Sequence, residues 1–398
     1  MAVIQLKKGE GRLLRDGGCW VFDNEIDKVQ GSYENGDIVT VISHEEVFLG
    51  KGYINGHSKI RVRILSRNEK EEINEAFFER KLRAAWEYRK KIMEVSSCRI
   101  VFSDADQLPG YIADKYEDVL VFQAETLGID LRKTMITDLL IKILKEDGIT
   151  LRGVYERSDA KVRVLEGLER VKGFYGKEFD PKVIITENGV KMEVDVAEGQ
   201  KTGYFLDQKM NRRAIHPIVK NARVLDCFTH TGSFALNAAK AGAKEVIAVD
   251  ASELAVAQGR RNALLNGFED TVTFRCADVL DLLPEFVEKG ELFDVVILDP
   301  PAFTKSKNSV KNALRGYREI NRQGLKLVKP GGFLVTASCS ENLTPDLFRK
   351  VIDEAARSLH KRLREVEYKT QSPDHPIVWG NPNTHYLKFA ILQVQDRF

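Results

Sequence analysis

The sequence predicts an α/β protein whose C-terminal part forms a doubly wound, mostly parallel sheet. The chain has 398 residues, more than one hydrophobic core usually organises, so two or three domains are expected. From about residue 190, short apolar runs alternate with helical segments, a rhythm typical of parallel strands with helices on both faces of the sheet. We predict domain boundaries at 1–70, 71–185 and 186–398.

The first two domains have a different rhythm. Apolar and polar residues alternate over 36–56 and 59–65, with interruptions by Gly and Asn, and this pattern favours a small β-barrel. The middle domain mixes both kinds of element and is predicted to be α+β. Its expected elements are a charged helix over 71–93, strands within 99–125, a helix over 131–148 and a strand over 153–159.

The third domain alternates strictly. Strands are expected over 222–228, 245–252, 272–279, 293–301 and 331–339, with helices over 232–242, 253–267, 281–290, 313–328 and 344–359. Two further strands, 363–370 and 385–395, close the chain. Ligands of such sheets bind beyond the carboxyl ends of the strands. The loops that follow the strands should therefore share one edge.

Composition excludes several classes of protein. Charged residues make up 30% of the chain and the net charge is only +2, so a nucleic-acid surface would have to be a local patch. No apolar run approaches the roughly 18 residues needed to cross a bilayer. The five cysteines are widely spaced without a CxxC pair, which argues against a disulfide framework and a zinc site. We expect a cytoplasmic protein without a structural metal.

The loop LDCFTHTGSF follows the first strand of the third domain. A strand ends at Asp226, and Gly232 allows close backbone approach just before a helix expected near Ser233. Neither G-x-G-x-x-G nor G-x-x-x-x-G-K-[ST] occurs here, which disfavours a nicotinamide or nucleoside-triphosphate ligand. A nucleoside with an amino-acid tail fits better, because its carboxylate can bind the helix N-terminus while Asp226 faces an ammonium or sulfonium. The alternative is a tight turn with a structural glycine.

The next two strands also end in carboxylates. Asp250 could accept hydrogen bonds from both ribose hydroxyls of a nucleoside. It could instead cap the following helix, although Ser252 is a candidate for that role. Asp278 could bind the adenine amino group or cap its own helix.

The motif VVILDPPAF is the sharpest local signal. Four apolar residues deliver Asp299 to the sheet edge, and two prolines, Pro300 and Pro301, stiffen the loop. Phe303 is then available to stack on a planar base. A turn without a functional role would need only one proline.

The motif TASCS places Cys339 after the next strand, which should lie beside the Asp299 strand. A thiolate there could attack C6 of a pyrimidine and load electron density onto C5, while Asp299 binds the base. The helix start after Cys339 could lower the pKa of its thiol. Cys19, Cys98 and Cys276 are expected to be small buried apolar residues. Cys227 also lies at the edge, but next to the cofactor loop.

Taken in order, these motifs resemble a class I S-adenosylmethionine-dependent methyltransferase. The whole chain is similar to the ribosomal RNA large-subunit methyltransferase I family, through LPGYIADKYEDVLVFQ, GYFLDQKMNRR, DPPAFTKSKNSVKNALRGYREIN and NPNTHYLKFAIL. The resemblance implies a PUA domain, a middle α+β domain and a methyltransferase domain. It also implies S-adenosylmethionine as cofactor and 5-methylcytosine in 23S ribosomal RNA as product.

By this resemblance, Cys339 is the nucleophile and Asp299 the base-binding acid. The cofactor contacts implied are Asp226, Gly232, Asp250, Asp278, Gln208 and Arg212. Many RNA 5-methylcytosine enzymes carry a second cysteine in the loop that here reads DPPAF, and this chain has none there. Product release assisted by a second thiol is therefore not available at that position.

A basic segment follows the DPPAF loop. Lys305, Lys307 and Lys311 precede three arginines, Arg315, Arg318 and Arg322, which fall three and four residues apart and so share a helix face. Pro300 and Phe303 with Lys305, Lys307, Arg315 and Arg318 are the expected RNA contacts. The alternative is an ordinary solvated helix face.

Several functions stay open from chemistry alone. Uracil-5 methylation uses the same thiol addition, and transfer to an exocyclic amine needs no thiol. A non-catalytic RNA-binding assembly factor is a further alternative, and a nicotinamide dehydrogenase is remote because its phosphate loop is missing. The expected partner is 23S ribosomal RNA, naked or in an assembling subunit, without a membrane. A homodimer is one option for the oligomeric state.

Overall fold

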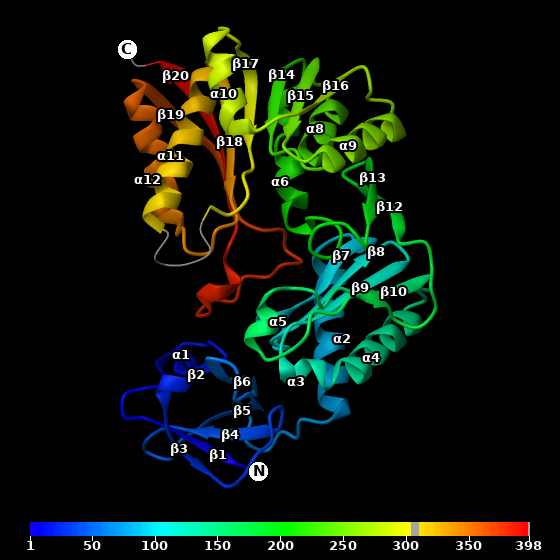
Figure 1. Cartoon of the computed structure of the whole chain (residues 1–398), viewed down its shortest axis with the longest axis vertical. Coiled ribbons are helices and arrows are strands. Elements are labelled where there is room, and N and C mark those ends of the chain that lie inside the picture. Colours follow the sequence, from blue (N-terminus) through cyan, green and yellow to red (C-terminus); the bar gives the residue numbers. More distant parts are fainter. Residues whose placement is uncertain (304–309, 397–398) are drawn as a thin grey trace. The chain divides into compact units, whose positions relative to one another are not determined.

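The computed structural model describes residues 1–303 and 310–396, which form two compact units (Figure 1). Unit 1 comprises Met1–Ile185, Val194–Leu206 and Pro373–Thr384, and unit 2 comprises Thr186–Glu193, Asp207–Ser372 and His385–Phe398. Each unit is therefore built from segments distant in sequence. None of the helices in the described part of the chain is long and apolar enough to cross a membrane.

The N-terminal part of unit 1 is a six-stranded sheet in the order β2-β6-β5-β4-β1-β3. Its strands are β1 Val3–Leu6, β2 Trp20–Phe22, β3 Ile26–Gln30, β4 Ile38–Ile42, β5 Phe48–Ile54 and β6 Ile60–Ser66, with short helices α1 Arg12–Arg15 and η1 Asp23–Glu25. The alternation in β4 buries Val39 and Val41. Gly52 is required in β5 because a Cβ there would meet the Arg63 carbonyl oxygen at 1.9 Å.

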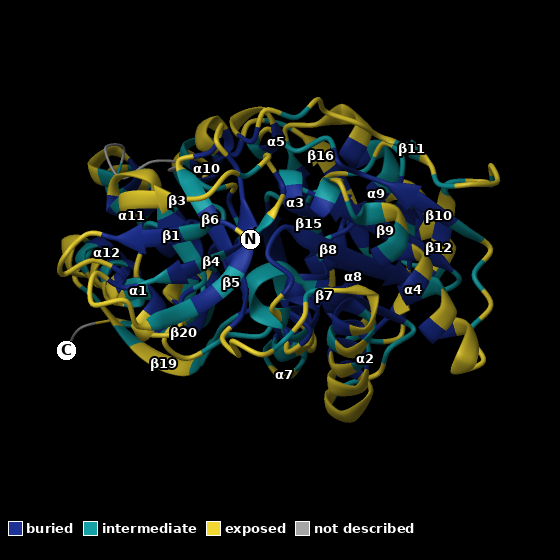
Figure 2. Cartoon of the chain, turned by 90° about the horizontal axis from the view of Figure 1, so that it is seen from below, coloured by how far each residue is buried: buried dark blue, intermediate teal, exposed yellow. Residues whose placement is uncertain are grey.

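The middle part of unit 1 is a five-stranded sheet in the order β11-β10-β9-β8-β7. Its strands are β7 Ser97–Phe102, β8 Tyr111–Tyr116, β9 Val119–Ala124, β10 Gly153–Glu156 and β11 Gly173–Phe174. Its helices are α2 Glu75–Ile92, η2 Ser103–Asp106, α3 Leu127–Asp130, α4 Lys133–Glu146 and α5 Val162–Leu165. The side chain of Asn74 caps α2 by accepting from the Phe77 amide. The strands are buried, whereas α2 exposes its outer face (Figure 2).

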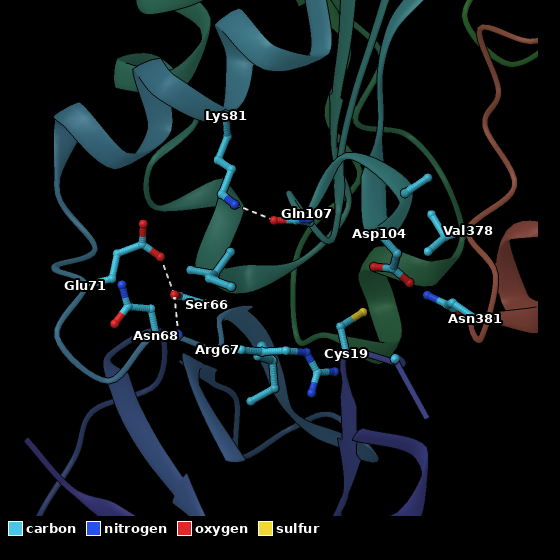
Figure 3. A pocket seen from close by; sticks show the side chains of 14 residues that line it. Cys19, Ser66, Arg67, Asn68, Glu71, Lys81, Asp104, Gln107, Val378 and Asn381 are labelled. Atoms are coloured by element: carbon cyan, nitrogen blue, oxygen red, sulfur yellow. Dashed lines mark hydrogen bonds between the residues drawn. The ribbon is translucent and has the colours of Figure 1, made fainter. Parts of the chain in front are cut away.

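The two parts of unit 1 are joined by buried polar contacts. Tyr53 Oη lies 2.8 Å from Thr126 Oγ1, and Arg63 forms an ion pair with Glu166 at 3.0 Å. Beside this joint lies a cavity of about 460 Å³. Polar side chains from both parts, including Arg67, Lys81 and Gln107, line it (Figure 3).

A two-stranded hairpin, β12 Lys182–Glu187 and β13 Val190–Asp195, follows unit 1's sheet in the chain. Asn188 and Gly189 form its turn with φ of 53° and 77°. An Asn-Gly pair with both φ values positive is the turn that best matches the twist of two antiparallel strands.

Unit 2 contains a seven-stranded sheet in the order β16-β15-β14-β17-β18-β20-β19. Its strands are β14 Arg223–Cys227, β15 Glu245–Asp250, β16 Val272–Cys276, β17 Phe293–Leu298, β18 Val328–Ser338, β19 Lys361–Lys369 and β20 Lys388–Asp396. Strands β14 to β18 pair in parallel, and β20 is antiparallel to β18 and β19. The predicted doubly wound sheet is confirmed, including the adjacency of β17 and β18.

Helices connect these strands. They are η3 Leu206–Gln208, α6 Lys209–Ala214, α7 His216–Val219, α8 Ser233–Lys240, α9 Glu253–Asn266, α10 Val279–Glu288, α11 Val310–Leu327 and α12 Pro345–Ser358; a short turn, η5 Pro382–Thr384, belongs to unit 1. The core between β14–β18 and helices α10 to α12 contains Leu225, Val296 and Leu298 with Ile320 and Ala355. This packing fixes the strand ends that carry the candidate site.

Candidate active site at the strand ends of unit 2

The carboxyl ends of four parallel strands bring the predicted residues to one edge of the sheet. Asp226 lies in β14 opposite Ala248 of β15 and Ile297 of β17. Asp299 directly follows Leu298, whose partner in β18 is Thr336. The same edge carries Asp250 at the end of β15 and Cys339 directly after β18.

Asp226 is fully buried. Its Oδ2 accepts hydrogen bonds from Thr229 Oγ1 at 2.5 Å and from the Ala235 amide at 2.9 Å, whereas Oδ1 has no hydrogen-bond partner among the described residues. Burial, with contributions from Asp299 and Asp250, raises the pKa of Asp226 to about 7. The charged form of a buried carboxyl with a raised pKa is stabilised by a nearby cation. The site therefore suits the ammonium or sulfonium of S-adenosylmethionine.

The loop after β14 is held in an unusual backbone conformation. Phe228 and His230 have φ of 63° and 52°, and Gly232, the residue before α8, has φ of 91°. A Cβ on Gly232 would meet the Phe274 ring at 2.7 Å. The positive φ and this close approach both require glycine. The His230 amide donates to Asp250 Oδ2 at 2.9 Å, which ties the loop to the end of β15.

The carboxylates that follow β15 and β16 also have local roles. Asp250 Oδ1 accepts from the Ser252 amide at 2.9 Å, and Ser252 caps α9 as predicted. Asp278 caps α10 by accepting from the Leu280 amide at 2.8 Å, so the alternative role considered for it is present. Contacts of either carboxylate with a ribose or adenine stay predictions. The expectation that Cys276 is buried is wrong, because it is exposed at the end of β16.

Asp299 is held by Gln208. The Gln208 Nε2 lies 3.1 Å from both Asp299 carboxylate oxygens. The Gln208 oxygen accepts from Asn211 Nδ2 at 2.6 Å, and Asn211 Nδ2 also lies 3.1 Å from the Thr370 carbonyl oxygen. Because Asn211 takes the amide oxygen, the amide nitrogen of Gln208 is directed at Asp299. Gln208, expected among the cofactor contacts, therefore also positions the proposed base-binding acid.

Arg212 lies on the same short helix. Its guanidinium forms a buried ion pair with Glu187, with Nη2 2.8 Å from Oε2. Its charge also reaches the neighbouring His230, whose pKa is lowered first by burial and additionally by Arg212. Arg212 thus adjoins the cofactor loop, and its direct contact with the cofactor stays a prediction.

Cys339 is half-buried between polar neighbours. Ser338 and Ser340, which flank it, hydrogen-bond the Tyr317 hydroxyl of α11 at 2.9 and 3.0 Å. Across the strand pair, Ser338 faces Lys388. Lys388 Nζ donates to the carbonyl oxygen of Ser340 at 2.6 Å. The cysteine therefore sits on a backbone fixed from both sides.

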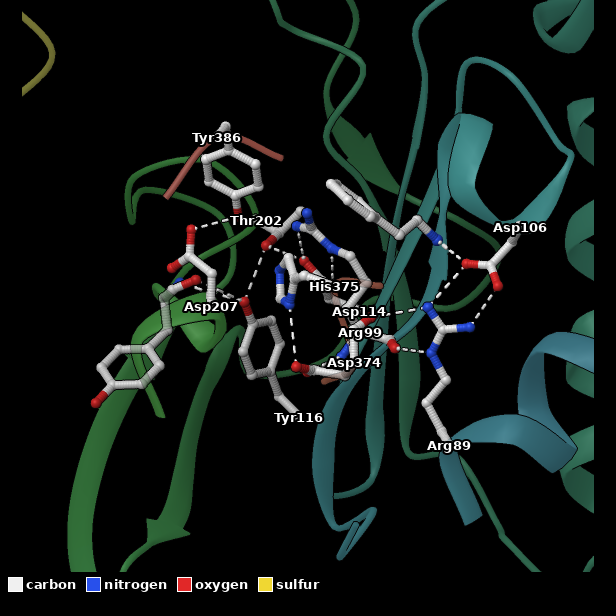
Figure 4. Close-up of polar contacts among 12 residues, drawn as sticks. Arg89, Arg99, Asp106, Asp114, Tyr116, Thr202, Asp207, Asp374, His375 and Tyr386 are labelled. Carbon is white, nitrogen blue, oxygen red and sulfur yellow. Dashed lines mark hydrogen bonds and ion pairs between the residues drawn. The ribbon is translucent and has the colours of Figure 1, made fainter. Parts of the chain in front are cut away.

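The segment before β20 reaches the same neighbourhood as η3. Tyr386 Oη donates to Asp207 Oδ2 at 2.7 Å (Figure 4). The carbonyl oxygen of Tyr386 accepts from Lys388 Nζ at 2.8 Å. One short stretch of chain thus connects the surroundings of Cys339 with those of Gln208.

The remaining predicted RNA contacts are placed unequally. Pro300 is buried, and Phe303 packs on Tyr317 with ring centroids 4.7 Å apart. Its ring is thus already used in packing, and base stacking by it stays a prediction. Lys305 and Lys307 lie outside the described residues.

Arg315 and Arg318 are exposed on α11. They line a cavity of about 350 Å³ between α11 and α12 together with Lys350 and Glu354. Arg318 lies 3.8 Å from Glu354, an exposed pair of little energetic value. Binding of phosphates by this face stays a prediction.

Three residues of this site were not singled out from the sequence: Asn211, Tyr317 and Lys388. Lys388 stands in the run HYLKFAIL, where one charged residue interrupts an apolar strand, and that interruption is the signal that could have identified it. Asn211 and Tyr317 give no comparable signal, because Asn211 joins Gln208 to Thr370, 159 residues further on, and the partners of Tyr317 are 21 and 23 residues away in sequence.

The fold and site define a S-adenosylmethionine-dependent methyltransferase with a PUA-like domain. The family model for S-adenosylmethionine-dependent methyltransferases matches residues 171–388, and that for the PUA-like domain matches residues 4–67. A crystal structure of a protein classed as a methyltransferase, complexed with SAH, superimposes with a TM-score of 0.84 at 21% identity, covering 99% of this chain and 100% of that one. This last likeness supports the fold.

The chain belongs to the ribosomal RNA large subunit methyltransferase I family. It is 39% identical over 398 residues to the member from Pseudoalteromonas translucida, covering 99% of both chains. It is 38% identical over 390 residues to the member from Aliivibrio fischeri (strain ATCC 700601 / ES114), covering 97% of both.

Proposed function

We propose that this protein methylates ribosomal RNA of the large subunit, forming 5-methylcytosine in 23S RNA through a covalent adduct with Cys339. Relatives alike over the full length are named ribosomal RNA large subunit methyltransferase I. The observation that carries the finer proposal is the pairing of β17 with β18, which places Asp299 and Cys339 at the ends of adjacent strands. A carboxylate and a thiol so placed can bind a pyrimidine ring and attack it.

In the proposed reaction, the Cys339 thiolate forms a bond from Sγ to C6 of the cytosine. The electron pair of the C5–C6 double bond moves onto C5, and Asp299, oriented by Gln208, hydrogen-bonds the polar edge of the ring. After methylation, loss of the C5 proton restores the double bond as the Sγ–C6 bond breaks. The thiolate leaves unchanged, so Cys339 is regenerated in each turnover.

S-adenosylmethionine supplies the methyl group when bound. Asp226 would face its positive charge, Gly232 and the N-terminus of α8 would take its carboxylate, and Asp250 and Asp278 would contact the nucleoside. The fit rests on the buried Oδ1 of Asp226, which lacks a partner among the described residues, and on the raised pKa of that carboxyl.

The RNA contacts proposed are the DPPAF loop, the exposed arginines of α11 and the PUA-like domain. Residues 4–67 match that domain model, and Arg315 and Arg318 are exposed beside a hollow between two helices. A target base must leave its stack to reach a thiol at the sheet edge. A cytoplasmic location, where ribosomal RNA would be met, is part of the same proposal.

Replacing Cys339 tests the covalent step. Cys339→Ala is expected to abolish methylation of 23S RNA, and RNA carrying 5-fluorocytidine should form a covalent adduct with the wild type only, because fluorine at C5 blocks proton loss. Cys276→Ala, which removes the exposed thiol at the end of β16, is the matched control and should keep activity.

The outcomes distinguish the alternatives. Full activity of Cys339→Ala would overturn both carbon-5 reactions and favour an exocyclic amine as acceptor. Nucleoside analysis showing 5-methyluridine would replace cytosine by uracil. Absence of cofactor binding with RNA binding intact would favour an assembly factor.

A further inference from the structure

We propose that Lys388 is the positioning residue whose ammonium stabilises the thiolate form of Cys339. This inference rests on the proposed nucleophilic role of Cys339 and adds the group that activates it. The sulfur alone is a weak nucleophile while it carries its proton.

The geometry places the Lys388 amine against the residues that flank the cysteine. Lys388 is 1% exposed and begins β20, where it is the register partner of Ser338, the residue before Cys339. Its Nζ lies 2.6 Å from the Ser340 carbonyl oxygen, on the other side of the cysteine, and 2.8 Å from the Tyr386 carbonyl oxygen. An ammonium can donate three hydrogen bonds, so two fix Nζ and one remains for a further acceptor.

The charge of the Lys388 ammonium favours the thiolate form of Cys339. Burial lowers the pKa of Lys388 to about 8, and the charges of Cys339 and Glu341 act against this lowering. By reciprocity, the ammonium lowers the pKa of the Cys339 thiol. Because its pKa of about 8 keeps Nζ an ammonium at pH 7, the proton that leaves Sγ goes to solvent, and the thiolate that remains forms an ion pair with Nζ.

The other charged or titratable groups around the pair do not replace the lysine. Burial raises the pKa of Tyr317 on α11, so its hydroxyl stays protonated. His385, on the segment before β20, has its pKa lowered by burial, with Lys388 contributing. Glu341 follows in the same loop, and Asp299 ends the adjacent strand; both are acidic and disfavour a thiolate. Cys339 is a cause of the pKa shifts of Tyr317 and Lys388, and of these two described residues Lys388 is the positively charged one.

The test measures ionisation of Cys339 without RNA or cofactor. The full-length protein is alkylated with iodoacetamide across pH 5.5–10 in the wild type and in Lys388→Met, and mass spectrometry follows the peptide that contains Cys339. We expect a thiol pKa below the ordinary value of about 8.5 in the wild type. Lys388→Met should raise it by at least about one unit, slowing alkylation at pH 7 about tenfold.

Lys361→Met is a matched control. Like Lys388, Lys361 begins a strand of the same sheet, donates to two carbonyl oxygens, those of Leu325 at 2.7 Å and Val328 at 3.3 Å, and has its pKa lowered by burial, although it is only partly buried. It starts β19, opposite Asp396 at the far end of β20. Its replacement should leave the alkylation profile of Cys339 unchanged, and Lys388→Arg should restore most of the profile lost in Lys388→Met.

Two results would overturn the proposal. One is a wild-type Cys339 thiol pKa at or above about 8.5, which needs no variant to fold. The other is an unchanged alkylation profile in a folded Lys388→Met protein. Neither depends on methylation, so retained activity of Cys339→Ala would refute the proposed function separately.

Discussion

At the scale of single residues, the candidate site concentrates negative charge where a cationic cofactor would bind. The pKa of Asp226 is raised to about 7, mainly by burial and additionally by the charges of Asp299 and Asp250. An enzyme gains from this arrangement only when a positive ligand completes it. The raised pKa of Asp226 should therefore be measurable in the protein without its cofactor.

Cofactor binding should release protons through Asp226. The raised pKa means that the free protein holds this proton between the ordinary value of 3.8 and about 7. A cation at the site lowers that pKa again, so affinity should rise with pH up to about 7 and level off above it. Titration calorimetry at pH 7 in buffers of different ionisation enthalpy should show about half a proton more released by the wild type than by Asp226→Asn.

Any proton that the cofactor itself releases on binding is the same for the wild type and Asp226→Asn, so the difference between the two proteins reports Asp226 alone. The asparagine keeps the size of the side chain and can still accept from Thr229 and the Ala235 amide. Equal proton release by both proteins would show that Asp226 does not face the positive charge of the cofactor.

At the scale of elements, the strand ends and the first turns of helices were predictable, whereas their cross-connections were not. The role of Ser252 as the cap of α9 follows from its position just before the helix. The pairing of β17 with β18 follows from the strand order usual in doubly wound sheets. The Gln208–Asp299 contact joins residues 91 positions apart, and no periodicity carries such information. Cys276 was misjudged because a strand-end cysteine can point to solvent as easily as to the core.

Helix α11 offers a prediction on RNA binding. Arg315→Gln with Arg318→Gln should weaken binding to a ribosomal RNA fragment across sequences and lower the slope of log affinity against log salt by about 1.4 to 1.8, since each lost phosphate contact removes about 0.7 to 0.9. Fluorescence anisotropy at several salt concentrations measures the slope. Both arginines are exposed, so folding should be preserved.

Arg357→Gln is the control for this pair. Arg357 lies on the neighbouring helix α12 and is paired with Asp353 at 2.6 Å on an exposed face. Its replacement also removes one positive charge from unit 2 but should leave the salt slope unchanged. Equal slopes for the double variant and the wild type would mean that α11 is an ordinary solvated helix.

At the scale of the whole molecule, unit 1 is completed by segments from far along the chain. Arg99 of β7 binds Asp114 of β8 with two contacts of 2.8 Å, and Asp114 accepts from Thr202 Oγ1 at 2.6 Å. The amide of Arg99 donates to the carboxylate of Asp374 at 2.9 Å (Figure 4). The alternation of strands and helices in the sequence suggested consecutive domains, and such a local pattern cannot predict these long-range polar contacts. The physical reason is that the segment 373–384 has no periodic pattern of its own.

Loss of Asp374 should therefore destabilise unit 1. Asp374 is fully buried; its carboxylate accepts from the Arg99 amide and contacts His375, while its carbonyl oxygen accepts from Arg89 at 2.8 Å. Asp374→Ala leaves the buried amide of Arg99 without its acceptor, which should cost about 1 to 3 kcal/mol of unfolding free energy.

Tryptophan fluorescence during guanidinium unfolding isolates this effect. The chain has 3 tryptophans, Trp20, Trp86 and Trp379, and all belong to unit 1. Asp353→Ala, which breaks an exposed i,i+4 pair in unit 2, should leave the fluorescence midpoint unchanged. An unchanged midpoint in Asp374→Ala would mean that 373–384 adds nothing to unit 1's stability. A lowered midpoint would show that unit 1 depends on residues 373–384, which are synthesised near the end of the chain. Unit 1 would then reach full stability only after most of unit 2 has been made.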